Sequence, residues 1–232
     1  MRLNVDAIVA YQTPATIAAS KATREIPIVM AGVGDPVGSG IIASLARPGG
    51  NVTGMTAGVI ELAGKIVELI REIIPLARQF AVLANDSDPF TRSFVAENHR
   101  IARNIGLEMQ PVLANPAGSL DAAFESMVAK HVDAVVIQGS LVGRRVADLA
   151  MKYQLPSLSA NVLLPRSGGL MSYSAGAYFS EAALYVSRIL NGEKPVNLPV
   201  SFPTKFELTV NVRTAKALNL TIRRRSSPAP MM

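Results

Sequence analysis

Short apolar runs alternate along the chain with longer stretches in which apolar residues recur every three or four positions. The short runs predict strands, and the longer stretches predict helices that bury one face. Regular alternation of the two predicts an α/β fold, with parallel sheets flanked by helices and joined by right-handed crossovers. The predicted strands cover residues 6–11, 26–31, 52–55, 80–84, 108–113, 134–138, 157–159, 169–173 and 206–210. The predicted helices cover residues 14–24, 37–46, 61–74, 90–105, 120–130, 141–153, 178–190 and 213–218.

Three of the predicted strands are each followed by a Thr-Pro or Asp-Pro pair that precedes a predicted helix. The pairs are Thr13-Pro14, Asp35-Pro36 and Asp88-Pro89. Each pair places a capping oxygen at the N-cap and a proline at the first helical position. Helix N-termini at the carboxyl edge of a parallel sheet lie where such sheets bind ligands, and they attract anions. Because a single pair is also an ordinary helix cap, only the set of three favours a ligand site.

A short predicted strand, residues 52–55, lies between glycine-rich turns. It favours a crossover between two lobes, with the return near residues 173–176. We therefore predict a discontinuous first lobe of residues 1–57 and 175–232, and a second lobe of residues 58–174. About nine strands also fit a single wide sheet, so the pattern leaves both arrangements open.

The composition indicates a globular protein with a sizeable core, since 49% of the 232 residues are apolar. The chain has no cysteine, which excludes disulfides and thiolate chemistry. The net charge is +6, but Arg223–Arg225 contribute part of it and aromatic residues make up only 5%. We interpret this charge as solvated surface with a basic tail, and we predict no nucleic-acid partner.

The motifs of common enzyme active sites are not found in the sequence. The glycine-rich loop of residues 32–40 has Val37 where a dinucleotide-binding motif needs glycine, and it lacks the Gly-Lys-Ser/Thr of a P-loop. Ser140 does not have the Gly-x-Ser-x-Gly spacing of a hydrolase nucleophile. The two histidines, His99 and His131, lie among polar neighbours without a carboxylate at ligand spacing. We therefore predict a binding protein rather than an enzyme, with no metal and no cofactor.

Four segments carry specific strings: VDAIVAYQTPATIAASKAT at residues 5–23, IPIVMAGVGDPVGSGIIASLARPGGNVTG at 26–54, GGLMSYSA at 168–175 and PTKFELTVNVRTAKALNLTI at 203–222. They strongly resemble the ABC-transporter substrate-binding family that is linked to tryptophan and tyrosine uptake. The resemblance implies a two-lobed type I periplasmic-binding-protein fold with a hinge and a ligand cleft. It also implies capture of a small amino-acid-like ligand, aromatic amino acids included, and delivery to an ABC permease in the membrane.

Two departures from this family concern the ends of the chain. Family members carry an export signal and a further strand, helix and strand before the position of Val5, so we expect an incomplete first lobe. Residues 223–232, RRRSSPAPMM, do not match the family's ending. A truncated gene, a frameshift and a misplaced start codon would each explain this pattern. The family implies a periplasmic location, whereas Asp6 interrupts the short apolar start, so the chain as given predicts a cytoplasmic one.

Candidate ligand-binding residues follow from the strand ends together with the resemblance. In the first lobe, Thr13 and the helix starting at Pro14 are candidates for a ligand carboxylate, and Asp35 is the candidate for an ammonium group. The candidates in the second lobe are Asn85, Ser87, Asp88, Ser140, Ser159, Asn161 and Tyr173. Tyr11 or Tyr173 could stack on an aromatic ring, although Tyr173 suits packing in the hinge equally well. We expect the hinge near residues 54–58 and 174–176.

The alternative hypothesis is a cytoplasmic small-molecule sensor or regulator built on the same fold. Such a protein would need a helix-turn-helix or a signalling partner. Neither is visible in the sequence.

Overall fold

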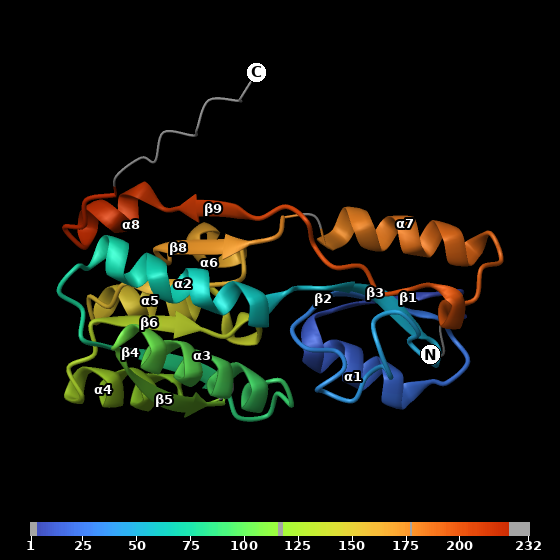
Figure 1. Cartoon of the computed structure of the whole chain (residues 1–232), viewed down its shortest axis with the longest axis horizontal. Coiled ribbons are helices and arrows are strands. Elements are labelled where there is room, and N and C mark those ends of the chain that lie inside the picture. Colours follow the sequence, from blue (N-terminus) through green and yellow to red (C-terminus); the bar gives the residue numbers. More distant parts are fainter. Residues whose placement is uncertain (1–3, 116–117, 177, 223–232) are drawn as a thin grey trace, which may run out of the picture.

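The computed structural model describes residues 4–115, 118–176 and 178–222 (Figure 1). Its strands are β1 (Ile8–Tyr11), β2 (Ile28–Val33), β3 (Val52–Thr56), β4 (Gln79–Asn85), β5 (Glu108–Ala114), β6 (Ala134–Ile137), β7 (Ser157–Ser159), β8 (Met171–Ser174) and β9 (Glu207–Val210). Its α-helices are α1 (Gln12–Ala22), α2 (Val59–Ile73), α3 (Thr91–Ile105), α4 (Leu120–Ala129), α5 (Arg144–Lys152), α6 (Leu163–Arg166), α7 (Tyr178–Leu190) and α8 (Val212–Ala217). Short 3-10 helices cover Gly139–Leu141 and Pro195–Asn197.

The strands form two separate sheets, which resolves the choice between one wide sheet and two smaller ones. One sheet has three parallel strands in the order β1-β2-β3, and the other has six in the order β5-β4-β6-β7-β8-β9. Among the described strands, only β9 runs antiparallel to its neighbour. The predicted α/β class with parallel sheets and flanking helices is confirmed. No strand pairs with the outer edge of β1 among the described residues.

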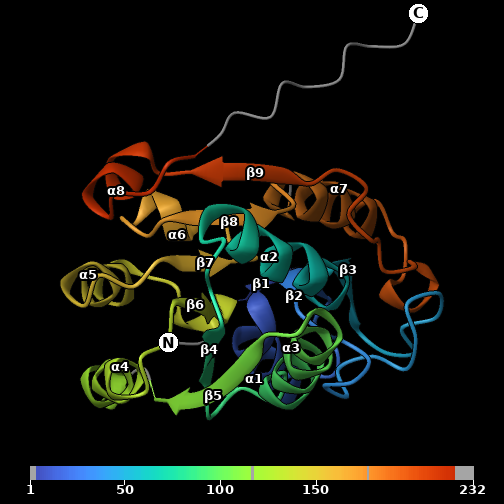
Figure 2. The same cartoon turned by 60° about the vertical axis from the view of Figure 1, so that its left-hand side comes forward.

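The six-stranded sheet is covered on both faces, so its central strands β4 and β6 carry continuous apolar runs. Phe80 and Val82 of β4 point to one face, where α2 and α3 pack. Ala81 and Leu83 point to the other face, where α4 and α5 pack. Figure 2 shows the strands stacked from β5 to β9 with these helices on either side. The continuous apolar run in β4 therefore follows from burial on two faces.

The three-stranded sheet also has two covered faces. Helix α7 packs on one face, with Tyr178 and Tyr185 against Val29 of β2. The other face, which includes Met30, packs with residues of α1 and of the loop that follows β2. Figure 1 shows α7 and α1 on opposite sides of this sheet.

The chain passes three times between the two sheets. Residues 57–58 lead from β3 to α2, and residues after β8 lead to α7. The third passage follows α7: Ser201 lies beside β3, where its backbone N–H donates to the Gly54 carbonyl at 2.9 Å, and the chain then enters β9. The predicted hinge segments coincide with the first two passages, and the third was not predicted.

The assignment of residues 175–232 to the first lobe needs a correction. Helix α7 packs on the three-stranded sheet as expected, but β9 pairs with β8 in the six-stranded sheet. Phe206, the residue before β9, packs on Tyr173 with ring centroids 6.0 Å apart, so the chain contacts the second lobe where β9 begins. We therefore propose that the second lobe consists of residues 58–174 and 206–222. Residues 223–232 lie outside the described part of the chain.

The helix predicted over residues 37–46 is absent, and turns occupy this segment instead. The Asp35 carboxylate accepts from the Gly38 backbone N–H at 2.8 Å, so it caps a turn rather than a helix. Gly40 has φ +70°, a left-handed conformation that ends helical geometry. Glycines at positions 38 and 40 thus override the apolar spacing that predicts a helix.

The other two Pro pairs lie at helix starts, but their caps differ from the prediction. Helix α1 has Tyr11 as its N-cap, and Thr13 is its second residue. The helix begins two residues before the predicted start at Pro14, and its first residue, Gln12, has a left-handed φ of +66°. Asp88 accepts from the Phe90 backbone N–H at 3.0 Å just before α3. Of the three Thr-Pro and Asp-Pro pairs, only Asp88-Pro89 therefore has a side chain that accepts a hydrogen bond from a backbone N–H next to the start of a helix.

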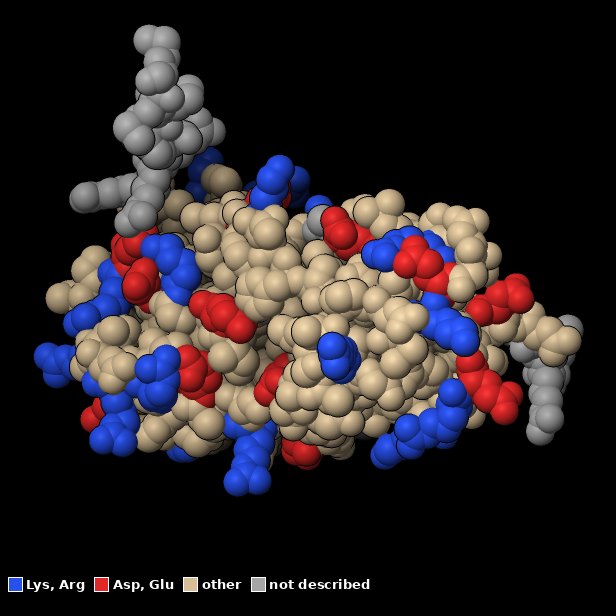
Figure 3. Space-filling view, turned by 45° about the vertical axis from the view of Figure 1, so that its right-hand side comes forward, with Lys and Arg blue, Asp and Glu red and all other residues tan. Residues whose placement is uncertain are grey.

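The charged side chains are mixed in sign on the face shown in Figure 3. Lys and Arg lie among Asp and Glu there rather than in one basic patch. None of the described helices has the length and apolar character needed to cross a bilayer.

Candidate functional site

A pocket lies between the two sheets, at the carboxyl ends of their strands. The second lobe contributes the segments after β4, β6 and β7 to its lining, and the first lobe contributes the segments after β1 and β2 together with the start of α7. Its volume is about 30 Å³, enough for one or two water molecules. The lobes must therefore separate to admit a larger ligand. A broader groove of about 570 Å³ lies beside α1, lined by first-lobe residues together with Pro89 of the second lobe.

Asp88 is the only charged side chain among the described residues that line the pocket. Its side chain is buried, and its Oδ2 accepts from the Ser140 hydroxyl at 2.8 Å and from Gln138 Nε2 at 3.0 Å. Burial raises the pKa of the Asp88 carboxyl, while the hydrogen bonds from Ser140, Phe90 and Gln138 oppose that rise. The site thus holds a buried carboxylate that has hydrogen-bond donors but no cation.

Gln138 holds the Asp88 carboxylate in place. Its Oε1 accepts from the Asn85 backbone N–H and from the Thr91 hydroxyl, both at 2.8 Å. These two donors fix the orientation of the amide, so its Nε2 is turned toward Asp88. Gln138 follows the apolar run of β6 directly, and this polar residue at a buried strand end was the signal that sequence reasoning left unused.

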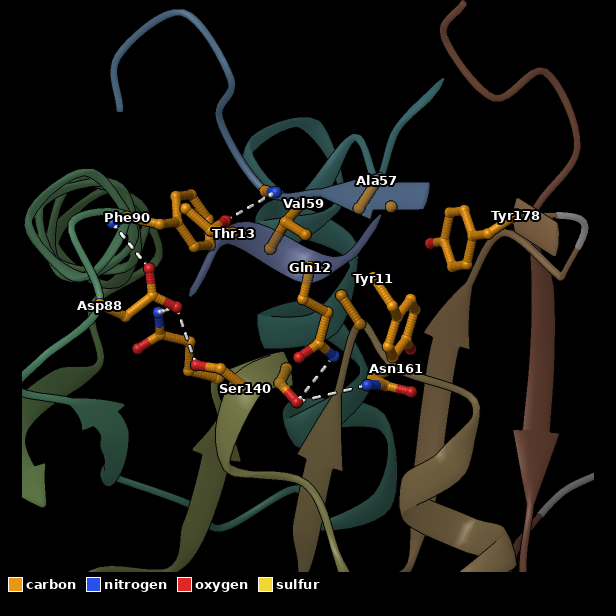
Figure 4. A pocket seen from close by; sticks show the side chains of 15 residues that line it. Tyr11, Gln12, Thr13, Ala57, Val59, Asp88, Phe90, Ser140, Asn161 and Tyr178 are labelled. Carbon is orange, nitrogen blue, oxygen red and sulfur yellow. Dashed lines mark hydrogen bonds between the residues drawn. The ribbon is translucent and has the colours of Figure 1, made fainter. Parts of the chain in front are cut away.

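Gln12 connects the two lobes directly. Its Nε2 donates to the Gly139 carbonyl at 3.0 Å, and the same carbonyl accepts from Asn161 Nδ2 at 3.3 Å. The left-handed backbone of Gln12 aims this side chain across the cleft (Figure 4). The sequence does not predict this contact between the lobes, because the left-handed conformation of Gln12 depends on how the chain passes from β1 into α1.

Aromatic side chains form much of the remaining wall. Tyr11 and Tyr178 come from the first lobe and Phe90 from the second. Burial raises the pKa of the Tyr11 hydroxyl, with hydrogen bonds to Gln12 and Asn161 opposing the rise. Burial also raises the pKa of Tyr178, and the nearby Tyr11 hydroxyl adds to that rise. Both phenols therefore stay protonated at neutral pH.

Four of the ten predicted site residues line this pocket: Thr13, Asp88, Ser140 and Asn161. Tyr11, the predicted stacking residue, lines it as well. Thr13 Oγ1 accepts from the Gly34 backbone N–H at 3.4 Å, which ties the start of α1 to the loop after β2. Asp88, Ser140 and Asn161 come from three different strand ends, as expected for neighbours at one sheet edge.

The other six predicted residues do not line the pocket: Pro14, Asp35, Asn85, Ser87, Ser159 and Tyr173. Asp35 caps its own turn, and the Ser159 hydroxyl donates to the Ile137 carbonyl at 2.7 Å within the sheet. Asn85 Oδ1 accepts from the Ser87 backbone N–H, and the Ser87 hydroxyl donates to Asp86 Oδ1, so both side chains bond within the loop after β4. Tyr173 packs on Phe206, which fits its alternative reading as a hinge-packing residue.

The histidines are remote from this chemistry. His99 and His131 are both exposed. Within the described residues, no group of three or more His, Asp and Glu side chains is placed to hold a metal ion.

Residues 2–230 match the sequence model of a family described as ABC transporter substrate binding protein. The chain belongs to this family. It is also 28% identical over 225 residues to the tyrosine-binding protein of Clostridioides difficile strain R20291, covering 93% of the chain but 63% of that protein's length. Proteins of this family bind substrates for transport rather than transform them.

Two solved structures are informative about the arrangement of the lobes. The ABC domain from Streptococcus pneumonia in complex with L-Trp has a TM-score of 0.84 at 26% identity, covering 95% of the chain and 77% of that protein. The ligand-free, open structure of a substrate binding protein from Clostridium difficile has a TM-score of 0.63 at 25% identity, covering 97% and 76%. The backbone of this chain is therefore closer overall to the L-Trp complex than to the open, ligand-free structure.

Proposed function

We propose that this protein captures an amino acid with an aromatic side chain in the cleft between its lobes and passes it to an ABC permease. The observation that carries the proposal is the pocket itself, in a chain of this family: its described lining holds a buried carboxylate, no basic side chain and the aromatic rings of Tyr11, Phe90 and Tyr178. The tyrosine-binding relative and the L-Trp complex support the class of ligand.

Asp88 is the proposed partner of the ligand ammonium. A buried carboxylate with a raised pKa is costly to ionise, and a ligand cation offsets that cost. Because the lining adds no basic side chain, a ligand with net negative charge is disfavoured. A zwitterionic amino acid matches this balance.

The ligand carboxylate then belongs at the start of α1. Gln12 and Thr13 are the first two residues of this helix, and backbone N–H groups in a first turn have no partner within the helix. The helix dipole favours an anion at this end. Binding to Asp88 of one lobe and to α1 of the other holds the lobes together around the ligand.

Location and partner follow from the family as part of the same proposal. Substrate-binding proteins of ABC importers act outside the cytoplasmic membrane, so we propose a periplasmic or extracellular site of action. The sensor and regulator hypothesis has support only from the fold: a LacI family transcriptional regulator from Bifidobacterium animalis has a TM-score of 0.60 at 13% identity.

Isothermal calorimetry with a panel of the natural amino acids tests this function. We expect heat of binding with at least one of L-tyrosine, L-tryptophan and L-phenylalanine, and none with L-glutamate. The matched analogue 3-(4-hydroxyphenyl)propionate lacks the ammonium of L-tyrosine and should bind at least about tenfold more weakly. An absence of heat with all three aromatic amino acids would reject the aromatic assignment.

A further inference from the structure

Helix α7 carries two buried tyrosines, and among the described residues the hydroxyl of one has a hydrogen-bond partner while that of the other has none. Tyr185 is 8% exposed, and its hydroxyl donates to the Pro199 carbonyl at 2.5 Å. Tyr178 is 6% exposed, and its hydroxyl has no hydrogen-bond partner among the described residues. The nearby Ala175 backbone N–H affects the pKa of Tyr178, but an N–H can only donate, so the phenol proton has no acceptor. A buried donor without an acceptor is costly and rare in native proteins.

The position of the Tyr178 ring is fixed by its surroundings. The ring packs on the backbone of Gly32, where even a methyl group would lie 3.2 Å from it. Gly32 has φ +70°, so both the space and the backbone at this position suit glycine. The hydroxyl therefore faces the pocket rather than turning away from it (Figure 4).

Tyr178 and Asp88 lie at opposite ends of the pocket, with Tyr11 and Gln12 between them (Figure 4). In an α-amino acid, the ammonium and the carboxylate are attached to the same carbon atom. Both groups must therefore bind at the end formed by Asp88 and the start of α1. The side chain of such a ligand then extends toward Tyr178.

We propose that the Tyr178 hydroxyl donates a hydrogen bond to a ring oxygen of the ligand and so makes the site selective for a phenol side chain. This inference rests on the proposed function and names the ligand feature that the site distinguishes. A phenol oxygen accepts a hydrogen bond, which satisfies the buried donor. A phenyl ring has no acceptor, and an indole N–H can only donate, so both leave the Tyr178 proton unpaired.

Such a site discriminates because only one of the two ligands satisfies the buried donor. The Tyr178 hydroxyl is unpaired among the described residues without ligand, L-phenylalanine leaves it unpaired, and L-tyrosine gains the hydrogen bond. L-tyrosine and L-phenylalanine differ by that single hydroxyl. Their affinity ratio therefore measures the hydrogen bond from Tyr178.

The test compares Tyr178→Phe and Tyr185→Phe in the full chain, with L-tyrosine, L-phenylalanine and L-tryptophan as ligands in calorimetry. We expect the wild type to prefer L-tyrosine to L-phenylalanine by at least about tenfold. Tyr178→Phe should lower the affinity for L-tyrosine by about tenfold and change that for L-phenylalanine by less than about twofold. Tyr185→Phe should leave all three affinities unchanged.

Thermal unfolding without ligand provides a second measurement. Tyr178→Phe removes an unpaired donor, so its Tm should not fall below that of the wild type. Tyr185→Phe loses a satisfied hydrogen bond, so its Tm should fall by about 2–4 °C. This contrast shows that both variants fold and that the two hydroxyls differ in their partners.

The outcomes separate the two proposals. If the wild type binds an aromatic amino acid but Tyr178→Phe leaves the ratio of L-tyrosine to L-phenylalanine unchanged, the role of Tyr178 is wrong and the proposed function stands. An equal loss for both ligands would also overturn it, because the hydroxyl would then contact the amino-acid moiety. A wild type that binds none of the three ligands overturns the proposed function and this inference with it.

Discussion

Asp88 gives the cleft its chemical character through a conflict between burial and charge. Three donors contact its carboxylate, namely Ser140, Gln138 and the Phe90 backbone N–H. Burial nevertheless dominates and raises its pKa above the ordinary value of 3.8. An ionised Asp88 carboxylate without a cation therefore lowers the stability of the folded protein, and a cation bound beside it offsets that cost.

The first prediction at the residue scale is that Asp88→Asn weakens binding of L-tyrosine by about 10- to 100-fold, because it removes the charge opposite the ligand ammonium. Calorimetry measures the loss. Asp86→Asn is the matched control, since Asp86 is exposed two residues away and does not line the pocket. An equal effect of the two substitutions would show that Asp88 acts through the loop rather than through contact with the ligand.

The same substitution has a pH dependence whose sign follows from the raised pKa. Because the Asp88 pKa is higher in the folded protein than in the unfolded chain, its contribution to stability is full below pH 3.8 and is lost as pH rises through the folded-state pKa. Asn cannot ionise and does not show this loss. The Tm of ligand-free Asp88→Asn minus that of the wild type should therefore increase between pH 4 and pH 7, and a constant difference would contradict the assignment.

Sequence reasoning identifies some site residues and misses others for definite reasons. Asp88, Ser140 and Asn161 lie within four residues of the ends of predicted strands, so strand alternation together with the family resemblance places them at the carboxyl edge. Gln12 and Tyr178 depend on a left-handed residue and on a helix that returns from the second lobe. Periodicity carries no information about either feature.

At the scale of elements, the prediction succeeds where burial dominates. Strand β4 lies inside a sheet covered on both faces, so its apolar run leaves little choice of structure. Residues 37–46 show the opposite case, since their apolar positions suit a helix while Gly38 and Gly40 favour turns. The predicted lobe boundary misses β9 for a related reason, because the pairing of β9 with β8 is a long-range contact that the local sequence pattern does not indicate.

Helix α8 shows how the end of the described chain is attached to the second lobe. Asn211 Oδ1 accepts from the backbone N–H groups of Arg213 and Thr214, at 3.1 and 3.2 Å. Its Nδ2 donates to the Pro165 carbonyl at 2.9 Å, which links the cap to α6. One side chain therefore both caps α8 and links it to α6.

We predict that Asn211→Ala lowers the free energy of unfolding by about 1–2 kcal/mol, since it removes the cap and the bond to Pro165. Asn211→Asp keeps an oxygen for the cap but loses the donor, so its loss should be smaller. Denaturant unfolding monitored by circular dichroism measures both. Neither substitution should alter ligand affinity, because Asn211 lies outside the pocket. A larger loss for Asn211→Asp than for Asn211→Ala would contradict the capping role.

At the scale of the whole molecule, a direct hydrogen bond joins the two lobes at the cleft. The hydrogen bond from Gln12 Nε2 to the Gly139 carbonyl joins the start of α1 to the segment after β6. It favours the arrangement of the lobes in this structure, whose backbone is closer overall to the L-Trp complex than to the open, ligand-free structure. A contact of this kind changes the equilibrium between open and closed lobes rather than the fit of a particular ligand.

Gln12→Ala should therefore lower affinity by about 2- to 10-fold, the value of one lost hydrogen bond, and by the same factor for every ligand that the wild type binds. Small-angle scattering should show a larger radius of gyration for the ligand-free variant and a return to the wild-type value at saturation. Gln12→Gly is the matched variant, because it loses the same bond while relieving the left-handed backbone at φ +66°. It should show the same affinity loss with a higher Tm than Gln12→Ala. A loss confined to one ligand would instead make Gln12 a ligand contact, in the manner proposed for Tyr178, and would leave closure to the ligand itself.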